Sequence, residues 1–321
     1  EIDLFELIRQ HAIEHIPALQ ELATAVAELD TVAALAWLAD QRRYVLPEVV
    51  DAPVIEIRDG RHPVLEQTLA EKFVPNDCDL GISPSSGEPE TLVILTGPNM
   101  AGKSTYIRQV ALLTLLAQTG SFVPAGRMRF GPADRIFARV GASDEISRGQ
   151  STFMVEMTEA ANILNNATER SLVIIDELGR GTSTFDGLSL AWAIAERLVT
   201  GLRCRTLFAT HYHELTQLED NLSGAVNYNV AVREWEDQII FLHRIIRGGT
   251  DRSYGSHVAK LAGIPPKVID RSREQLIELE SNFAAIRRAP IRTAVRTKPA
   301  PKDNQLLLFP ELDPGDEIIE E

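Results

Sequence analysis

The first part of the chain carries apolar residues at helical spacing. From residue 2 to about residue 38, leucine, isoleucine and alanine recur every three or four positions. This spacing gathers them on one face of a helix, and the alanines of the second half would let helices approach closely. The pattern predicts one or two packed helices over these residues.

The region between residues 47 and 87 has a looser pattern. Short β-like pieces occur at residues 54–57 and 64–65, separated by proline, glycine, asparagine and aspartate. Such residues favour turns between short strands. We therefore expect a small layer of strands in front of a larger core.

The middle of the chain alternates short apolar runs with helical patterns. Apolar runs cover residues 91–96, 172–175 and 206–209, and helical spacing follows at residues 105–120 and 188–198. Buried strands that alternate with helices form parallel sheets covered on both faces. The fold class predicted is α/β, with a mixed or parallel sheet flanked by helices.

The last third predicts a hairpin, a helix pair and a tail. Residues 223–247 alternate apolar and polar positions around a central Glu-Asp pair, which is typical of a β-hairpin. Residues 255–262 and 266–286 have helical spacing and are separated by Gly-Ile-Pro-Pro, so they predict a helix-turn-helix. From residue 289 the chain is rich in proline and charge, which predicts disorder.

Composition excludes several classes of protein. With 44% apolar residues in 321, the chain can bury a large core, and no uninterrupted apolar run is long enough to span a membrane. The two cysteines, Cys78 and Cys204, suggest neither a disulfide framework nor a zinc site. The net charge of -14 argues against one continuous DNA-binding surface. The two cysteines fit a reducing cytoplasm. The sequence opens with Glu1 inside a helical pattern, so we expect a fragment of something larger.

The strongest chemical signal is a glycine-rich loop between the predicted strand 91–96 and the helix after it. Residues 97–104 read Gly-Pro-Asn-Met-Ala-Gly-Lys-Ser and satisfy the pattern G-x-x-x-x-G-K-[ST]. Backbone N–H groups of such a loop converge on phosphate oxygens, while Lys103 reaches the β- and γ-phosphates and Ser104 helps to hold Mg²⁺. The loop predicts binding of a nucleoside triphosphate with Mg²⁺.

Polar residues at the ends of the two later strands predict the rest of the site. Asp176 ends the strand 172–175 and is expected on the metal side, and Glu177 is placed to orient or deprotonate the attacking water. His211 follows the strand 206–209 and is expected to contact the γ-phosphate, because carboxyl ends of neighbouring parallel strands share one crevice.

A further helix begins at Ser151 or Thr152. Its start reads Ser-Thr-Phe-Met-Val-Glu-Met. From the residues alone this is either a capped helix or an anion-binding helix start, and spacing does not separate the two.

Four segments together resemble the MutS family of DNA mismatch-repair ATPases, a branch of the ABC-type ATPases. They are GPNMAGKST, STFMVEM, DELGRGTS and ATHYHEL, and the similarity runs over nearly the whole chain. The resemblance implies a dimer with two composite ATP sites, each completed by Ser151 of the other subunit, and a crossing loop at residues 181–187. It also implies that Phe73 stacks on adenine, that His243 lies near the base and that Asn99 positions the γ-phosphate. The residues expected to bind the nucleotide are thus Gly97, Pro98, Asn99, Met100, Ala101, Gly102, Lys103, Ser104, Thr105, Phe73 and His243.

The same resemblance implies a domain plan. Residues 1–45 correspond to the end of a helical lever, 46–250 to the ABC-type ATPase and 251–288 to a helix-turn-helix used for dimerisation. Residues 289–321 form a tail, in which Gln305, Leu306, Leu307, Leu308 and Phe309 resemble peptides that bind the replication sliding clamp. Mismatched duplex DNA would be bound by domains that lie outside this sequence, and a MutL-type repair protein would be the next partner.

Three alternatives remain beside this interpretation. An ABC-type ATPase of a transporter or another repair system should carry an LSGGQ-like signature, from which Ser-Thr-Phe-Met at residues 151–154 departs. A non-catalytic module that only dimerises around a nucleotide is disfavoured by the intact Lys103 and Glu177. A MutS-like paralogue with a nuclease tail is disfavoured by the helix-turn-helix and the clamp-like peptide.

Overall fold

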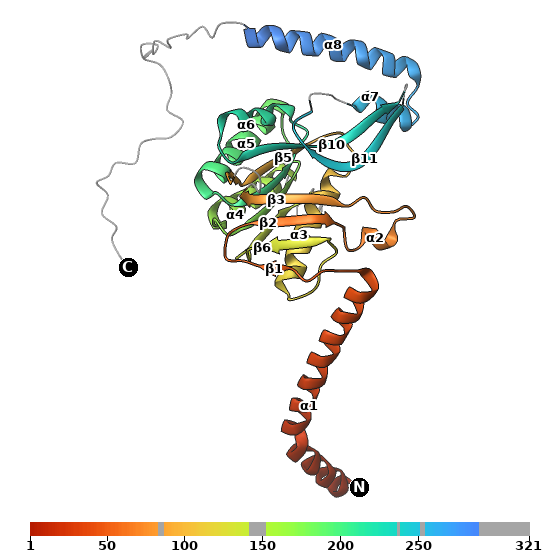
Figure 1. Cartoon of the computed structure of the whole chain (residues 1–321), viewed down its shortest axis with the longest axis vertical. Coiled ribbons are helices and arrows are strands. Elements are labelled where there is room, and N and C mark those ends of the chain that lie inside the picture. Colours follow the sequence, from red (N-terminus) through yellow and green to blue (C-terminus); the bar gives the residue numbers. More distant parts are fainter. Residues whose placement is uncertain (83–86, 141–151, 236–237, 251–253, 289–321) are drawn as a thin grey trace, which may run out of the picture. The chain divides into compact units, whose positions relative to one another are not determined.

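The computed structural model describes residues 1–82, 87–140, 152–235, 238–250 and 254–288 (Figure 1). The chain divides into two compact units, residues 1–265 and residues 266–321. Within the described residues, the second unit consists of helix α8 (Pro266–Arg288). All other elements belong to the first unit.

A six-stranded sheet, called here the main sheet, forms the centre of the first unit. Its order is β11 (Gln238–Arg247), β10 (Ala225–Trp235), β5 (Leu92–Thr96), β9 (Arg205–Ala209), β8 (Leu172–Asp176) and β7 (Ile136–Arg139). Neighbours from β10 to β7 are parallel, and β11 is antiparallel to β10. The predicted strands and the hairpin are thus confirmed, as is the α/β class with a mixed sheet.

Two apolar cores cover the two faces of the main sheet. Successive strand residues point to opposite faces, so Val93 and Leu95 of β5 lie in one core and Leu92 and Ile94 in the other. Helix α3 (Lys103–Gln118) packs in the first core, and helices α4 (Thr152–Asn166) and α5 (Thr184–Arg197) pack in the second. Burial on both faces explains why these strands are continuous apolar runs.

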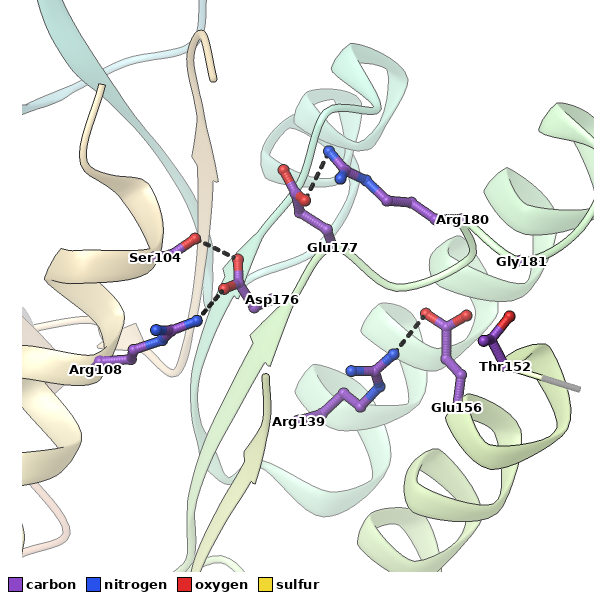
Figure 2. A pocket seen from close by; sticks show the side chains of 9 residues that line it. All are labelled: Ser104, Arg108, Arg139, Thr152, Glu156, Asp176, Glu177, Arg180 and Gly181. Carbon is purple, nitrogen blue, oxygen red and sulfur yellow. Dashed lines mark hydrogen bonds and ion pairs between the residues drawn. The ribbon is translucent and has the colours of Figure 1, made fainter. Parts of the chain in front are cut away.

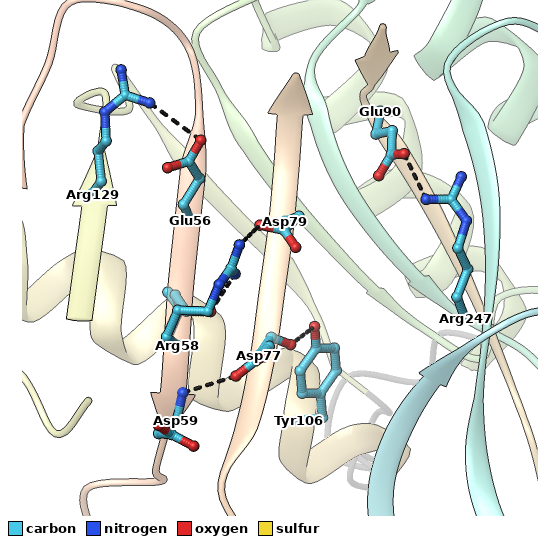
Figure 3. Close-up of polar contacts among 10 residues, drawn as sticks. Glu56, Arg58, Asp59, Asp77, Asp79, Glu90, Tyr106, Arg129 and Arg247 are labelled. Atoms are coloured by element: carbon cyan, nitrogen blue, oxygen red, sulfur yellow. Dashed lines mark hydrogen bonds and ion pairs between the residues drawn. The ribbon is translucent and has the colours of Figure 1, made fainter. Parts of the chain in front are cut away.

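A second, five-stranded sheet, called here the side sheet, closes the first core. Its order is β1 (Glu48–Val49), β6 (Arg127–Phe130), β2 (Ile55–Gly60), β3 (Asn76–Ile82) and β4 (Pro89–Glu90). Figure 3 shows the polar contacts that fasten it. Arg58 pairs with Asp79 across β2 and β3 at 2.8 Å, and the Tyr106 hydroxyl of α3 donates to the Asp77 carbonyl at 2.9 Å. The predicted layer of strands is therefore present and is tied to α3.

A buried arginine joins the two sheets. Arg205 begins β9 with 1% of its surface exposed, and its guanidinium donates to the carbonyl oxygens of Gly131 at 2.6 Å and Val54 at 3.2 Å. It also donates to the carbonyls of Pro132 and Arg170. Burial lowers the pKa of Arg205 to about 10. Backbone oxygens accept from both terminal nitrogens of this cation, whereas its buried Nε has no hydrogen-bond partner within the described residues. The side chain crosses from the main sheet to the segments around the side sheet.

The first helix is longer than predicted and mostly exposed. Helix α1 runs unbroken from Ile2–Arg42 with Pro17 inside it, and Ala39 is its buried residue. It is long and apolar enough to cross a membrane by length and composition, although Glu28 and Asp30 interrupt its apolar run. Because the core helix of a soluble protein or a signal sequence passes the same criterion, this is weak support for a membrane span. The two acidic residues are the reason why the sequence has no uninterrupted apolar run of spanning length here.

One predicted strand is a helix. Residues 64–65, expected to be β-like, begin the helical turn α2 (Leu65–Thr68). The His62 ring is the physical reason, because its Nδ1 accepts the N–H groups of Val64 and Leu65, both at 3.3 Å. A side chain that accepts the first free N–H groups favours a helix start.

The remaining elements are short. They are the π-helical turn η2 (Leu198–Leu202), the 3₁₀ turn η3 (His213–Gln217), and helices α6 (Leu218–Asn221) and α7 (Gly255–Leu261). Helices α7 and α8 confirm the two helical segments expected near the end of the chain, and residues 289–321 lie outside the described residues.

Candidate functional site

The glycine-rich loop connects β5 to α3 and is shaped by backbone that favours glycine. Gly97 and Gly102 have φ of 132° and 107°, values that L side chains rarely adopt. Lys103 opens α3 with 4% of its surface exposed, and its Nζ donates to the carbonyls of Gly97 at 2.6 Å and Pro98 at 3.1 Å. The ammonium group is therefore folded into the loop, where phosphate oxygens can replace these carbonyls.

Burial gives this lysine an unusual environment. Removal from water lowers the pKa of Lys103, although the negative charges of Glu177 and Asp176 act in the opposite direction. A buried cation with few fixed partners is strongly stabilised by an incoming anion. The loop thus has both the geometry and the charge to bind phosphate.

Asp176 lies beside the start of α3, where Ser104 faces it. The Ser104 hydroxyl donates to Asp176 Oδ1 at 3.0 Å, and Arg108 Nη2 lies 3.6 Å from Asp176 Oδ2 (Figure 2). Seventy-two residues separate Ser104 from Asp176 in the chain. Parallel pairing of β5, β9 and β8 brings the two groups to one edge of the main sheet.

Glu177 follows directly and its backbone is in the left-handed region. Its φ is 59°, and its N–H donates to the Ala209 carbonyl at 2.9 Å. Glu177 Oε2 pairs with Arg180 Nη2 at 2.6 Å, and both residues line the same pocket as Asp176 (Figure 2). A non-glycine residue held at positive φ in a cleft is a strained position of the kind that functional sites contain.

His211 lines a second cavity, which the glycine-rich loop also borders. Gly97, Pro98, Asn99, His211 and His213 line one cavity of about 540 Å³, together with residues of α7. Partial removal from water lowers the pKa of His211, and the positive charges of Arg180 and Lys103 lower it further. The ring is therefore neutral near pH 7 and can donate or accept a hydrogen bond.

Phe73 and His243 share a third cavity, of about 450 Å³. It is also lined by Met100, Gly102 and Thr105 of the loop and helix. The side chain of Asn76 donates to the His243 carbonyl at 2.9 Å, and His243 Nδ1 lies 2.9 Å from the Ala101 carbonyl. An aromatic ring next to a phosphate-binding loop offers a face on which a nucleobase can stack.

The pocket drawn in Figure 2 offers oxygen atoms for a hard cation. It measures about 400 Å³ and is lined by Ser104, Arg108, Arg139, Thr152, Glu156, Asp176, Glu177, Arg180 and Gly181. Within the described residues there is no cluster of three or more His, Cys, Asp or Glu that could hold a metal alone. One hydroxyl and one carboxylate fit Mg²⁺, which is commonly bound through one or two protein oxygens, water and substrate phosphates.

Comparison with known proteins gives the family. The profile of MutS domain V matches residues 93–280. The chain is 60% identical to the DNA mismatch repair protein MutS of Rhodopirellula baltica over 87% of its length, and 52% identical to that of Ruminiclostridium cellulolyticum over 100%. This chain belongs to the MutS family. It covers 31% and 36% of those two relatives, so it spans about a third of their length.

Most of the site residues predicted from the MutS motifs occur close to one another. Apart from Ala101 and Lys103, the loop residues 97–105 line three cavities. The first also contains Asp176 and Glu177, the second His211, and the third Phe73 and His243. Ser151 lies outside the described residues, as do residues 305–309. Thr152, the next residue after Ser151, lines the pocket that holds Asp176.

Four residues of the pocket that contains Asp176 were not predicted to be functional from the sequence of this chain. Arg108, Arg139 and Arg180 surround the carboxylates, and Glu156 is buried among them. Arg180 and Glu156 lie within the motifs DELGRGTS and STFMVEM, which was the available signal. Arg108 and Arg139 carry no such signal, because only folding places them near Asp176 and Glu156.

Proposed function

We propose that this chain is the nucleotide switch of a MutS mismatch-repair protein, which binds ATP with Mg²⁺ and hydrolyses it. The observation that carries the proposal is the meeting of Lys103, Ser104 and Asp176 at one edge of the main sheet, with Glu177 next to them. ABC-type ATPases need these groups together to hold a triphosphate and a water molecule in line.

Each residue has a distinct role in this proposal. Lys103 and the N–H groups of residues 97–105 bind the phosphates, Asn99 helps to position the γ-phosphate, and Ser104 and Asp176 hold Mg²⁺. Bound Mg²⁺ neutralises charge that develops on the phosphates. Glu177 orients or deprotonates the attacking water once Arg180 releases it, and neutral His211 contacts the γ-phosphate.

The adenine base is held in the cavity that Phe73 and His243 line beside the glycine-rich loop. Phe73 stacks on adenine and His243 lies beside it, which agrees with the cavity that both residues line. Phe73 and His243 would thus hold the base of ATP, and the glycine-rich loop would hold its phosphates near Asp176.

The working form is a homodimer with two composite sites. Ser151 at the start of α4 completes the site of the other subunit, and residues 181–187 form the loop that crosses between the sites. Residues 251–288 act as the helix-turn-helix that supports dimerisation, residues 46–250 as the ATPase and residues 1–45 as the end of a lever. ATP closes the two subunits on each other, and hydrolysis reopens them.

In the whole protein this cycle converts binding of mismatched duplex DNA into a sliding clamp that recruits a MutL-type partner. Other domains read the mismatch, and residues 305–309 bind the replication sliding clamp. These proposed partners imply that the protein acts in the bacterial cytoplasm, at the nucleoid. The alternative function, an ABC-type ATPase subunit of another DNA-repair or transport system, is not favoured because the family match is to MutS.

The test is a mixing experiment. Lys103→Ala and Ser151→Arg chains are assayed for ATPase activity alone and in equal mixture, because a site shared between subunits can be rebuilt by mixing. We expect each variant to be inactive and the mixture to recover activity. Folded variants that associate and recover nothing would contradict the composite site, and a wild-type chain without ATPase activity would contradict the proposal as a whole.

A further inference from the structure

Gly179, two residues after Glu177, is held by three contacts. The N–H of Gly179 donates to Glu156 Oε1 at 2.7 Å, and its carbonyl accepts the Tyr212 hydroxyl at 3.0 Å. A Cβ added to Gly179 would lie 2.7 Å from the carbonyl oxygen of Gly187, so the backbones of these two glycines are in close contact. The loop that leaves Glu177 is therefore fixed at Gly179.

Glu156 belongs to the first turns of α4, not to the strand that carries Glu177. Only 2% of its surface is exposed, and Arg139 Nη2 lies 3.5 Å from the same Oε1 atom. Figure 2 shows the carboxylate between Arg139 and Gly181 of the loop. A buried carboxylate is costly unless it is paired and hydrogen-bonded, so its two partners fix its position.

A second contact joins the same two elements. Gly181 approaches the first turn of α4 so closely that an added Cβ would lie 2.8 Å from Cβ of Phe153. Two contacts, one polar and one steric, thus make the start of α4 and the loop after Glu177 move together.

We propose that Glu156 is a positioning residue, which passes the position of the α4 start to Glu177 through the N–H of Gly179. The inference rests on the proposed function, since it assigns Glu177 to the attacking water. A shift of α4 pulls Gly179, and because Glu177 and Arg180 flank Gly179 in the chain, the Glu177–Arg180 pair is reoriented with it. ATP hydrolysis is thereby coupled to whatever displaces the start of α4.

Three variants test this. Glu156→Ala removes the acceptor, Glu156→Gln keeps an oxygen acceptor for Gly179, and Glu159→Gln is the matched control. Glu159 lies on the same helix 2.9 Å from Arg139 Nε but is half exposed, and in the part of the chain that the structure describes no hydrogen bond links it to the loop. Each is measured for ATPase kcat and KM, equilibrium ATP binding, thermal unfolding and amide hydrogen exchange of the peptide that contains Gly179.

We expect Glu156→Ala to lower kcat by about 10- to 100-fold, the usual effect of a misplaced catalytic group, with unchanged ATP affinity. Glu156→Gln should restore most of kcat, and Glu159→Gln should match the wild type. Exchange at Gly179 should accelerate by about tenfold in Glu156→Ala, since one hydrogen bond is lost. A role in stability alone would lower the unfolding temperature without this division between kcat and binding.

Unchanged kcat in folded Glu156→Ala, or unchanged exchange at Gly179, would overturn the proposal. If Glu156→Ala does not fold, Glu156→Asp keeps the negative charge near Arg139 but shortens the side chain by one methylene, and unchanged exchange and kcat in that variant would overturn the proposal equally. If the wild-type chain hydrolyses no ATP, the proposed function fails, and exchange at Gly179 still decides whether Glu156 positions the loop.

Discussion

Replacement of Lys103 by methionine should separate nucleotide affinity from stability. The change keeps the apolar length of the side chain and removes a cation that is 4% exposed. A charge-assisted hydrogen bond is worth about 1.5 to 3 kcal/mol, so we expect ATP to bind about 10- to 150-fold more weakly.

The nucleotide-free protein should change much less. Loss of the ammonium group frees the carbonyls of Gly97 and Pro98, which costs about 1 to 3 kcal/mol. The same change removes a buried charge, whose cost is visible in the lowered pKa of Lys103. Because the two effects oppose each other, the free energy of unfolding should fall only slightly.

The assay is an equilibrium titration with a fluorescent ATP analogue, together with thermal unfolding with and without ATP. Arg127→Met is the control, since it removes an exposed cation of the side sheet that pairs with Glu48. We expect ATP to stabilise the wild type and the control but not Lys103→Met. A folded Lys103→Met chain with wild-type ATP affinity would refute the assignment of this loop to phosphate binding.

Four further predictions concern other parts of the molecule. Glu177→Gln should retain ATP binding while turnover collapses, and unchanged turnover would remove Glu177 from the hydrolytic role. Phe73→Ala should weaken ATP binding by about 10-fold, as expected for loss of one stacked base, and an unchanged Kd would place the base elsewhere. Burial lowers the pKa of His62, as does the charge of Arg108, so the unfolded chain binds this proton more readily and stability should be lost as pH falls below about 6.5. His62→Gln should flatten that slope between pH 6.5 and 5, measured by denaturant titration, since about one proton is involved, and an unchanged slope would exclude His62 as its source. Deletion of residues 305–309 should abolish capture of the chain by the sliding clamp with an unchanged ATPase rate, and retained capture would contradict the clamp assignment.

Sequence patterns predicted those parts of the fold and site that depend on neighbouring residues. The glycine-rich loop, Asp176 and Glu177 form contiguous motifs, and the strands beside them are apolar because both faces of the main sheet are buried. Predicted helix 105–120 begins two residues earlier, at Lys103. That difference arises because the loop itself leads directly into the first turn.

Contacts between segments that are distant in the chain could not be predicted from the sequence in the same way. The turn α2 forms because His62 accepts two N–H groups, although Val64 and Leu65 have a β-like pattern. Glu156 resembles an ordinary helical glutamate, and its burial depends on Arg139 and Gly179, which lie on other elements. Such pairings are fixed by tertiary packing, which one sequence does not reveal.

Arg205 has a consequence for the order in which the protein folds. Its carbonyl partners belong to residues as far as 151 positions earlier in the chain, so the junction of the two sheets has a high contact order. During synthesis the strands β1 to β6 leave the ribosome well before Arg205. The Val54 carbonyl already accepts the N–H of Gly131 at 2.8 Å, but the carbonyls of Val54 and Gly131 gain the Arg205 guanidinium only after β9 has been made. The side sheet therefore reaches its final packing late in synthesis.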